Sequence, residues 1–132
     1  MSTERRIYIN NDLDVVMARM QAREMAKQLG FGTADQARIS LAASEVARVL
    51  AWNLSRPGEI ILSVANRNGH HGIQVVCLLD LEQGLTDEAS DGVGTNAGRS
   101  RSLAGARQLV DESIIEEQDD KYTRVTLIKW LK

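Results

Sequence analysis

The sequence has little of what secreted, membrane or nucleic-acid-binding proteins need. Its single cysteine, Cys77, has no partner for a disulfide, which indicates a reducing compartment and so a cytoplasmic location. No apolar run approaches the ~20 residues of a membrane span, and the polar N-terminus is unlike a signal peptide. With 16 basic and 18 acidic residues the net charge is −2, so no basic field attracts nucleic acid.

The rest of the composition is that of an ordinary globular protein. The chain has 132 residues, of which 43% are hydrophobic and 26% charged. A chain of this size can bury one core without disulfides or a metal ion. We therefore expect one domain over residues 1–132.

The first elements predicted are a short strand, Arg6–Ile9, and a helix, Asp12–Leu29. The helix is predicted because apolar residues recur at helical spacing and Gly30 is a typical helix stop. The apolar stripe assigned to this helix is Leu13, Val16, Met17, Met20, Met25 and Leu29. We interpret its methionines as core residues in preference to a docking groove.

A second helix is expected to open at a capping box, Thr33–Gln36, and to run to Leu50 before Pro57–Gly58 ends the segment. Two β-hairpins are predicted where two apolar runs are separated by a turn. The first joins Glu59–Arg67 to Gly72–Leu79 around the turn Asn68–His71, and the second joins Ile114–Ile115 to Tyr122–Trp130.

A long polar segment, Asp80–Ser102, separates the two hairpins. A loop of this length inside a compact domain is usually either functional or disordered, and helical spacing returns after it over Leu103–Glu112. Together the elements predict a two-layer α/β (α+β) sandwich, with helices packed on one face of a mixed, mostly antiparallel sheet.

Four stretches carry a family resemblance, in this order along the chain: Ala26–Thr33 with Asp35–Ile39, Ser44–Arg48, Leu103–Arg107 with Asp111–Glu112, and Ile128–Leu131. They resemble segments of the GHKL (Bergerat) ATPases, and specifically the small serine/threonine switch kinases, or anti-sigma-factor kinases, of bacterial partner-switching systems. Within that family the stressosome kinase is the nearest match. The resemblance implies a histidine-kinase-like ATPase (Bergerat) fold.

In the first nucleotide-binding box, the resemblance implies a Glu that activates the attacking group and, one turn later, an Asn that binds Mg²⁺. Glu45 matches the Glu and is the candidate catalytic base. Val49 stands at the Asn position and offers no oxygen to a metal ion, so no metal ligand is assigned. The alternative for Glu45 is a surface ion pair with Arg48 or Arg38.

In the second box, Asp-x-Gly-x-Gly in the family, the Asp contacts adenine and the glycines allow a tight turn beside it. Asp80 and Gly84 match this pattern and are candidate ATP-binding residues. Glu82 replaces the first glycine and brings a side chain and a negative charge to the place where the backbone would pass the ligand.

The third box is the glycine-rich lid that cradles phosphates through backbone amides. Gly98 and Gly105 remain, while Ser100 and Ser102 stand at glycine positions between them. Two arginines in the same segment are candidates for phosphate contacts, with a solvated basic loop as the alternative: Arg99 and Arg101.

These departures favour a degenerate kinase domain, a pseudokinase that needs neither ATP nor Mg²⁺ as cofactor. The partners that the resemblance implies are a STAS-domain antagonist or a downstream phosphatase or regulator; a homodimer is left open. Arg38 and Arg48 share a charged helix face and are the candidate partner contacts, with a plain solvated face as the alternative. The alternative function is an active ATP- and Mg²⁺-dependent serine/threonine protein kinase that phosphorylates the STAS-domain antagonist.

Other noticeable residues are given structural roles. His70 and His71 are expected in a surface turn because no further ligand joins them to hold a metal. Cys77 is expected to be a buried small hydrophobe rather than a nucleophile. Trp52 and Trp130 are interpreted as packing residues.

Overall fold

The computed structural model describes residues 4–51, 58–80, 103–118 and 122–131. These residues include a five-stranded sheet in the spatial order β1-β2-β3-β5-β4. The strands are β1 (Arg5–Ile9), β2 (Gly58–Arg67), β3 (His70–Asp80), β4 (Glu112–Gln118) and β5 (Tyr122–Trp130). All four described pairings are antiparallel, where the sequence predicts a mixed, mostly antiparallel sheet.

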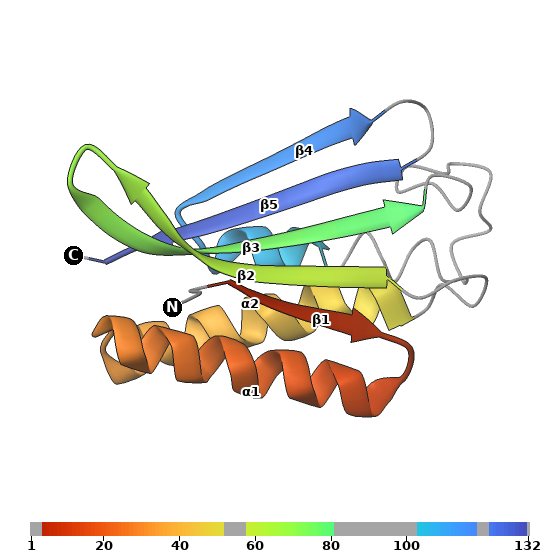
Figure 1. The fold of residues 1–132 in the computed structure, drawn as a ribbon, viewed down its shortest axis with the longest axis horizontal. Coiled ribbons are helices and arrows are strands. Elements are labelled where there is room, and N and C mark those ends of the chain that lie inside the picture. The colour runs from red at the N-terminus through yellow and green to blue at the C-terminus, as the bar shows by residue number, and fades with distance from the viewer. Residues whose placement is uncertain (1–3, 52–57, 81–102, 119–121, 132) are drawn as a thin grey trace.

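Two long helices, α1 (Asp12–Leu29) and α2 (Thr33–Ala51), cover one face of this sheet (Figure 1). The predicted two-layer α+β sandwich is confirmed. The core lies between the layers, where alternate residues of the central strands meet the helices. It includes Ile60 and Leu62 of β2, Ile73, Val75 and Cys77 of β3, and Val125 and Leu127 of β5.

Local contacts explain where the helices begin and end. The Asn11 side chain accepts a hydrogen bond from the Asp14 backbone N–H at 3.1 Å and caps α1. Gly30, in the left-handed region at φ 98°, ends α1 as predicted. The predicted capping box is wrong, because Thr33 is already helical and the Gln36 backbone N–H donates to the Gly32 carbonyl at 2.9 Å.

Helix α1 turns a different face to the core than the sequence predicts. Its buried residues are Val15, Ala18, Ala22, Met25 and Ala26. Of the predicted apolar stripe, Met25 is buried and Leu29 packs at the edge of the core, but four members are 36–69% exposed: Leu13, Val16, Met17 and Met20. A row of alanines lets the helix lie close to its neighbours, so the larger side chains point outward.

The first hairpin turns at two residues, Asn68 and Gly69, whose φ angles are 51° and 83°. Positive φ at both positions is the geometry of a type I′ turn, which matches the twist of the flanking strands. The predicted four-residue turn is therefore too long, and the exposed His70 and His71 begin β3. At Gly72 an added Cβ would collide with the Lys129 carbonyl oxygen of the paired strand, so this position requires glycine.

The last predicted helix is shorter than expected. Residues 103–108 are helical, but the Asp111 backbone N–H donates to the Ile128 carbonyl at 3.0 Å, and Glu112 already belongs to β4. The second hairpin is confirmed, with β4 longer than the predicted Ile114–Ile115. The predicted loop after Asp80 and the Trp52 side chain lie outside the described residues.

Cys77 lies at the centre of β3 and is fully buried. Burial among apolar side chains raises the pKa of its thiol well above the usual range, so the reactive thiolate is suppressed. The prediction of a buried small hydrophobe is confirmed. Among the helices that the structure describes, none is long and apolar enough to cross a membrane.

Candidate functional site

The first nucleotide-binding box lies on the carboxyl-terminal half of α2. The Glu45 carboxylate accepts a bond from Arg48 Nη1 at 3.0 Å, so the ion-pair alternative describes its contact in this structure. Its side chain is 24% exposed. Val49, one turn on, is fully buried in the hydrophobic core. The position expected to present a metal ligand therefore presents methyl groups packed against other side chains.

The second and third boxes are described only in part. Asp80 ends β3, where its backbone pairs with Tyr122, and the carboxyl ends of β3 and α2 lie at the same end of the molecule (Figure 1). Gly105 lies in the helical residues 103–108, and a Cβ added there would meet nothing within 4 Å, so packing does not require glycine. The other box residues lie outside the described part of the chain: Glu82, Gly84, Gly98, Arg99, Ser100, Arg101 and Ser102.

The outward side of α2 carries both predicted partner contacts. We call Arg38, Leu41, Glu45 and Arg48 the α2 outer face. The two arginine side chains are about half exposed, and Arg38 pairs with Asp35 at 2.7 Å. Leu41 is 48% exposed between them. On the opposite side Ile39, Val46 and Val49 are buried, so the predicted division into charged and apolar faces is confirmed.

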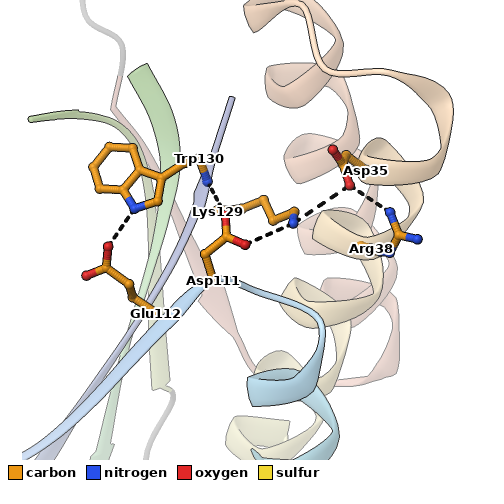
Figure 2. A network of polar contacts seen from close by, with 6 residues as sticks. All are labelled: Asp35, Arg38, Asp111, Glu112, Lys129 and Trp130. Carbon is orange, nitrogen blue, oxygen red and sulfur yellow. Dashed lines mark hydrogen bonds and ion pairs between the residues drawn. The ribbon is translucent and has the colours of Figure 1, made fainter. Parts of the chain in front are cut away.

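A polar network that the sequence does not reveal lies at the other end of α2 (Figure 2). Lys129 Nζ reaches Asp111 Oδ1 at 3.2 Å and Asp35 Oδ1 at 3.8 Å, with its side chain only 11% exposed. Asp111 also accepts the Trp130 backbone N–H at 2.7 Å. The start of α2, the end of β5 and the entry to β4 are thereby held together.

Trp130 extends this network across the sheet edge. Its indole N–H donates to the Glu112 carboxylate at 2.5 Å, and the Arg67 guanidinium lies 4.9 Å from its ring centroid. Arg67 also pairs with Glu112 at 2.8 Å. The hydrogen bond from Trp130, followed by that from Arg67, lowers the pKa of Glu112. Trp130 is therefore the packing residue that the sequence predicts, with a polar anchor that it does not.

These residues come from segments that already carry the family resemblance: Asp35, Asp111 and Glu112, Lys129 and Trp130. Their meeting depends on how α2 and β5 are placed in space, and local sequence patterns hold no signal for it. No group of three His, Cys, Asp or Glu side chains suited to a metal ion occurs among the residues described.

Comparison with known proteins adds to this geometry. No family model matches the chain. A chain in the crystal structure of the SiaB–SiaC complex from Pseudomonas aeruginosa superimposes with a TM-score of 0.53 at 12% identity, covering 97% of this chain and 89% of that chain. This similarity agrees with the fold that the sequence motifs predict.

The serine/threonine-protein kinase RsbT of Bacillus subtilis (strain 168) is 33% identical over 135 aligned residues. The alignment covers 100% of both chains. A match of this extent leaves no large insertion or missing segment between the two proteins. This chain therefore belongs to the RsbT-type family of serine/threonine switch kinases of bacterial partner-switching systems.

Proposed function

We propose that this protein is a cytoplasmic partner-switching regulator that acts by binding other proteins, with ATP binding lost or weakened. Its partners are a STAS-domain antagonist or a downstream phosphatase or regulator. Full-length similarity to RsbT supports the signalling role, and the solved structure with the same fold is itself a complex of two proteins. The observation that carries the loss of nucleotide chemistry is the burial of Val49.

Phosphoryl transfer depends on positioning and on neutralising the charge of the phosphates, for which kinases use Mg²⁺. Mg²⁺ takes oxygen ligands in near-octahedral geometry, and a valine in the hydrophobic core supplies none. The carboxylate of Glu45, the candidate base, is engaged by Arg48. Both features of the first box favour binding over catalysis.

The α2 outer face fits the docking role. Two half-exposed guanidinium groups flank the exposed Leu41 on one rigid helix, and their ion pairs, with Asp35 and Glu45, are short-range surface pairs. Surface pairs of this kind contribute only ~0.3–0.5 kcal/mol, so a partner carboxylate can replace them at small cost. Arginine also forms forked bonds to carboxylates, which suits an acidic partner surface.

A titration with Mg·ATP tests the nucleotide part of the proposal. We expect the melting temperature to stay unchanged at millimolar Mg·ATP, measured by differential scanning fluorimetry beside RsbT as the comparison protein. A ligand present at about 100 times its Kd stabilises the folded state by ~2.7 kcal/mol, which is an easily measured shift. A Mg²⁺-dependent rise in melting temperature would support the active kinase instead.

Charge reversal on the α2 outer face tests the docking part. With a STAS-domain protein from the same organism as the probe, Arg48→Glu should slow association and weaken the complex, and the loss should shrink at high salt. Arg124→Glu is the matched control, because Arg124 is an exposed arginine of the sheet strand β5 and is not part of the α2 outer face. Equal affinities for the two variants at both salt concentrations would remove this face from the interface.

A further inference from the structure

The outward side of α1 carries large apolar side chains that no described residue covers. We call Leu13, Val16, Met17 and Met20 the α1 stripe; they are 69%, 36%, 41% and 59% exposed. They lie at helical spacing opposite the alanine-rich face that packs on the core. A continuous apolar stripe on one helix is more than the scattered exposure normal for a soluble protein, and it marks an interaction surface.

Charged residues follow one flank of the stripe. Asp12, Arg19 and Arg23 are spaced i, i+7 and i+11, which places them on the same side of α1. The two arginines face α2 across a surface hollow of about 460 Å³, lined by Arg19, Met20, Arg23, Ala37, Ser40 and Leu41. Neither arginine forms an ion pair with another residue that the structure describes.

We propose that the α1 stripe is the interface of a homodimer in which two α1 helices pack antiparallel. A twofold axis between Val16 and Met17 sets Leu13 against Met20 of the second copy and brings the two central pairs together. Asp12 lies ~7 Å along the helix from this axis, and Arg19 and Arg23 lie ~4 Å and ~10 Å from it on the other side. Along the helix axis, each Asp12 therefore lies between the positions of Arg19 and Arg23 of the second copy, and it lies on the same side of the helix pair as they do.

This self-complementarity is what a second copy requires. A twofold interface uses the same patch on both subunits. An acidic residue at one end of the patch therefore has to lie beside a basic residue at the other end of the patch on the second copy. A binding partner with a different sequence would need no such symmetry within α1.

The size of the stripe sets the strength expected. With the axis between Val16 and Met17 the two helices overlap over residues 12–21, a length of ~15 Å, and a strip ~10 Å wide along this overlap covers roughly 150 Å² per copy. Stable complexes bury about 800 Å² per partner. We therefore expect a dimer that forms with rising protein concentration. This inference is independent of the proposed nucleotide and docking functions.

Sedimentation velocity of the full chain over a concentration series tests the interface. The wild-type protein should pass from monomer to dimer, and Met17→Glu should raise the dimer Kd by about tenfold or more, because it sets two carboxylates beside the axis. The matched control is Ile114→Glu on β4, since Ile114 is 44% exposed and lies on the opposite layer. A wild-type protein that stays monomeric, or a dimer disrupted by the control and not by Met17→Glu, would refute the proposal.

Exchanged charges test the antiparallel arrangement. Asp12→Arg and Arg19→Glu should each weaken self-association, because each sets like charges together across the axis. When the two variants are mixed, both pairs are attractive again in the heterodimer, so association should return towards the wild-type level. Circular dichroism of each variant shows that the helices remain folded. A mixture no stronger than the separate variants would overturn the arrangement.

Discussion

Helices α1 and α2 lie side by side on the sheet, but they differ in where they place their large apolar side chains. Helix α2 buries large residues such as Ile39 and Leu50 beside its buried alanines, and exposes arginines with Leu41 between them. Helix α1 buries a row of alanines and exposes leucine, valine and methionine. The comparison shows that the larger apolar stripe of a helix does not always face its own core.

The difference has a physical basis in packing distance. Small side chains let the helix pack closely against its neighbours. The many van der Waals contacts made at this short distance then stabilise the helix in place of the burial of a few large apolar side chains. The large groups of α1 then remain available to another molecule. The predictions below test this contrast, from the largest expected effect to the smallest.

Val49→Asn should be the most damaging change on α2. It removes buried methyl groups and leaves an amide without partners in the core, so we expect a loss of about 3 kcal/mol in the free energy of unfolding. Urea denaturation measures this loss. The neighbouring change Arg48→Asn, on the exposed side, should stay within about 0.5 kcal/mol. If Val49→Asn costs no more than this control, position 49 borders an open site.

Ala22→Leu should be the equivalent test on α1. Ala22 is fully buried, so three extra carbons force the helix away from the core, at a cost of about 2 kcal/mol. Met20→Gln, two residues earlier on the outward side, should change stability by less than about 0.5 kcal/mol. The contrast between the helices fails if these two substitutions have similar effects in the same denaturation assay.

Lys129→Met should loosen α2 while leaving α1 in place. The ammonium group is nearly buried between Asp35 and Asp111, and its loss removes a charged hydrogen bond and leaves two carboxylates together. We expect a loss of about 1–2 kcal/mol. Amide hydrogen exchange should quicken in the first turns of α2. Faster exchange in α1 instead would show that the network does not anchor α2.

The pH dependence of Glu112 should give the smallest effect, at the sheet edge away from both helices. Because the folded state lowers the pKa of Glu112 below its ordinary 4.5, the ionised carboxylate stabilises the fold above that value. This contribution is lost as the pH falls through the lowered pKa. Wild type should therefore be more stable than Glu112→Gln at pH 7, and the gap should close on acidification. A gap independent of pH would assign the effect to packing of Trp130.

Local patterns were sufficient for most of the fold. The turn of the first hairpin is predicted in the right place, though two residues too long, because Asn68 and Gly69 are residue types that tolerate positive φ, and Gly30 predicts a helix end for the same reason. The face of α1 was predicted wrongly because two stripes share helical spacing, and hydrophobicity alone favours the larger side chains of Leu13 and Met20. Only the shape of the neighbouring layer decides between them.

The candidate site was less predictable for a related reason. Residue type at Val49 excludes a metal ligand without any structure, but its burial follows from the packing of α2 on the sheet. Likewise Lys129 is 94 residues from Asp35 in sequence (129 − 35), so no local pattern could pair them. Such contacts are consequences of topology.

The burial of Cys77 has a practical consequence. It is the only thiol in the chain and lies at the centre of the middle strand, where a labelling reagent cannot reach it. Reaction with such a reagent requires that the helices lift from the sheet or that β3 separate from its neighbours. The labelling rate under native conditions therefore measures how often the core opens, without denaturant and without an engineered cysteine.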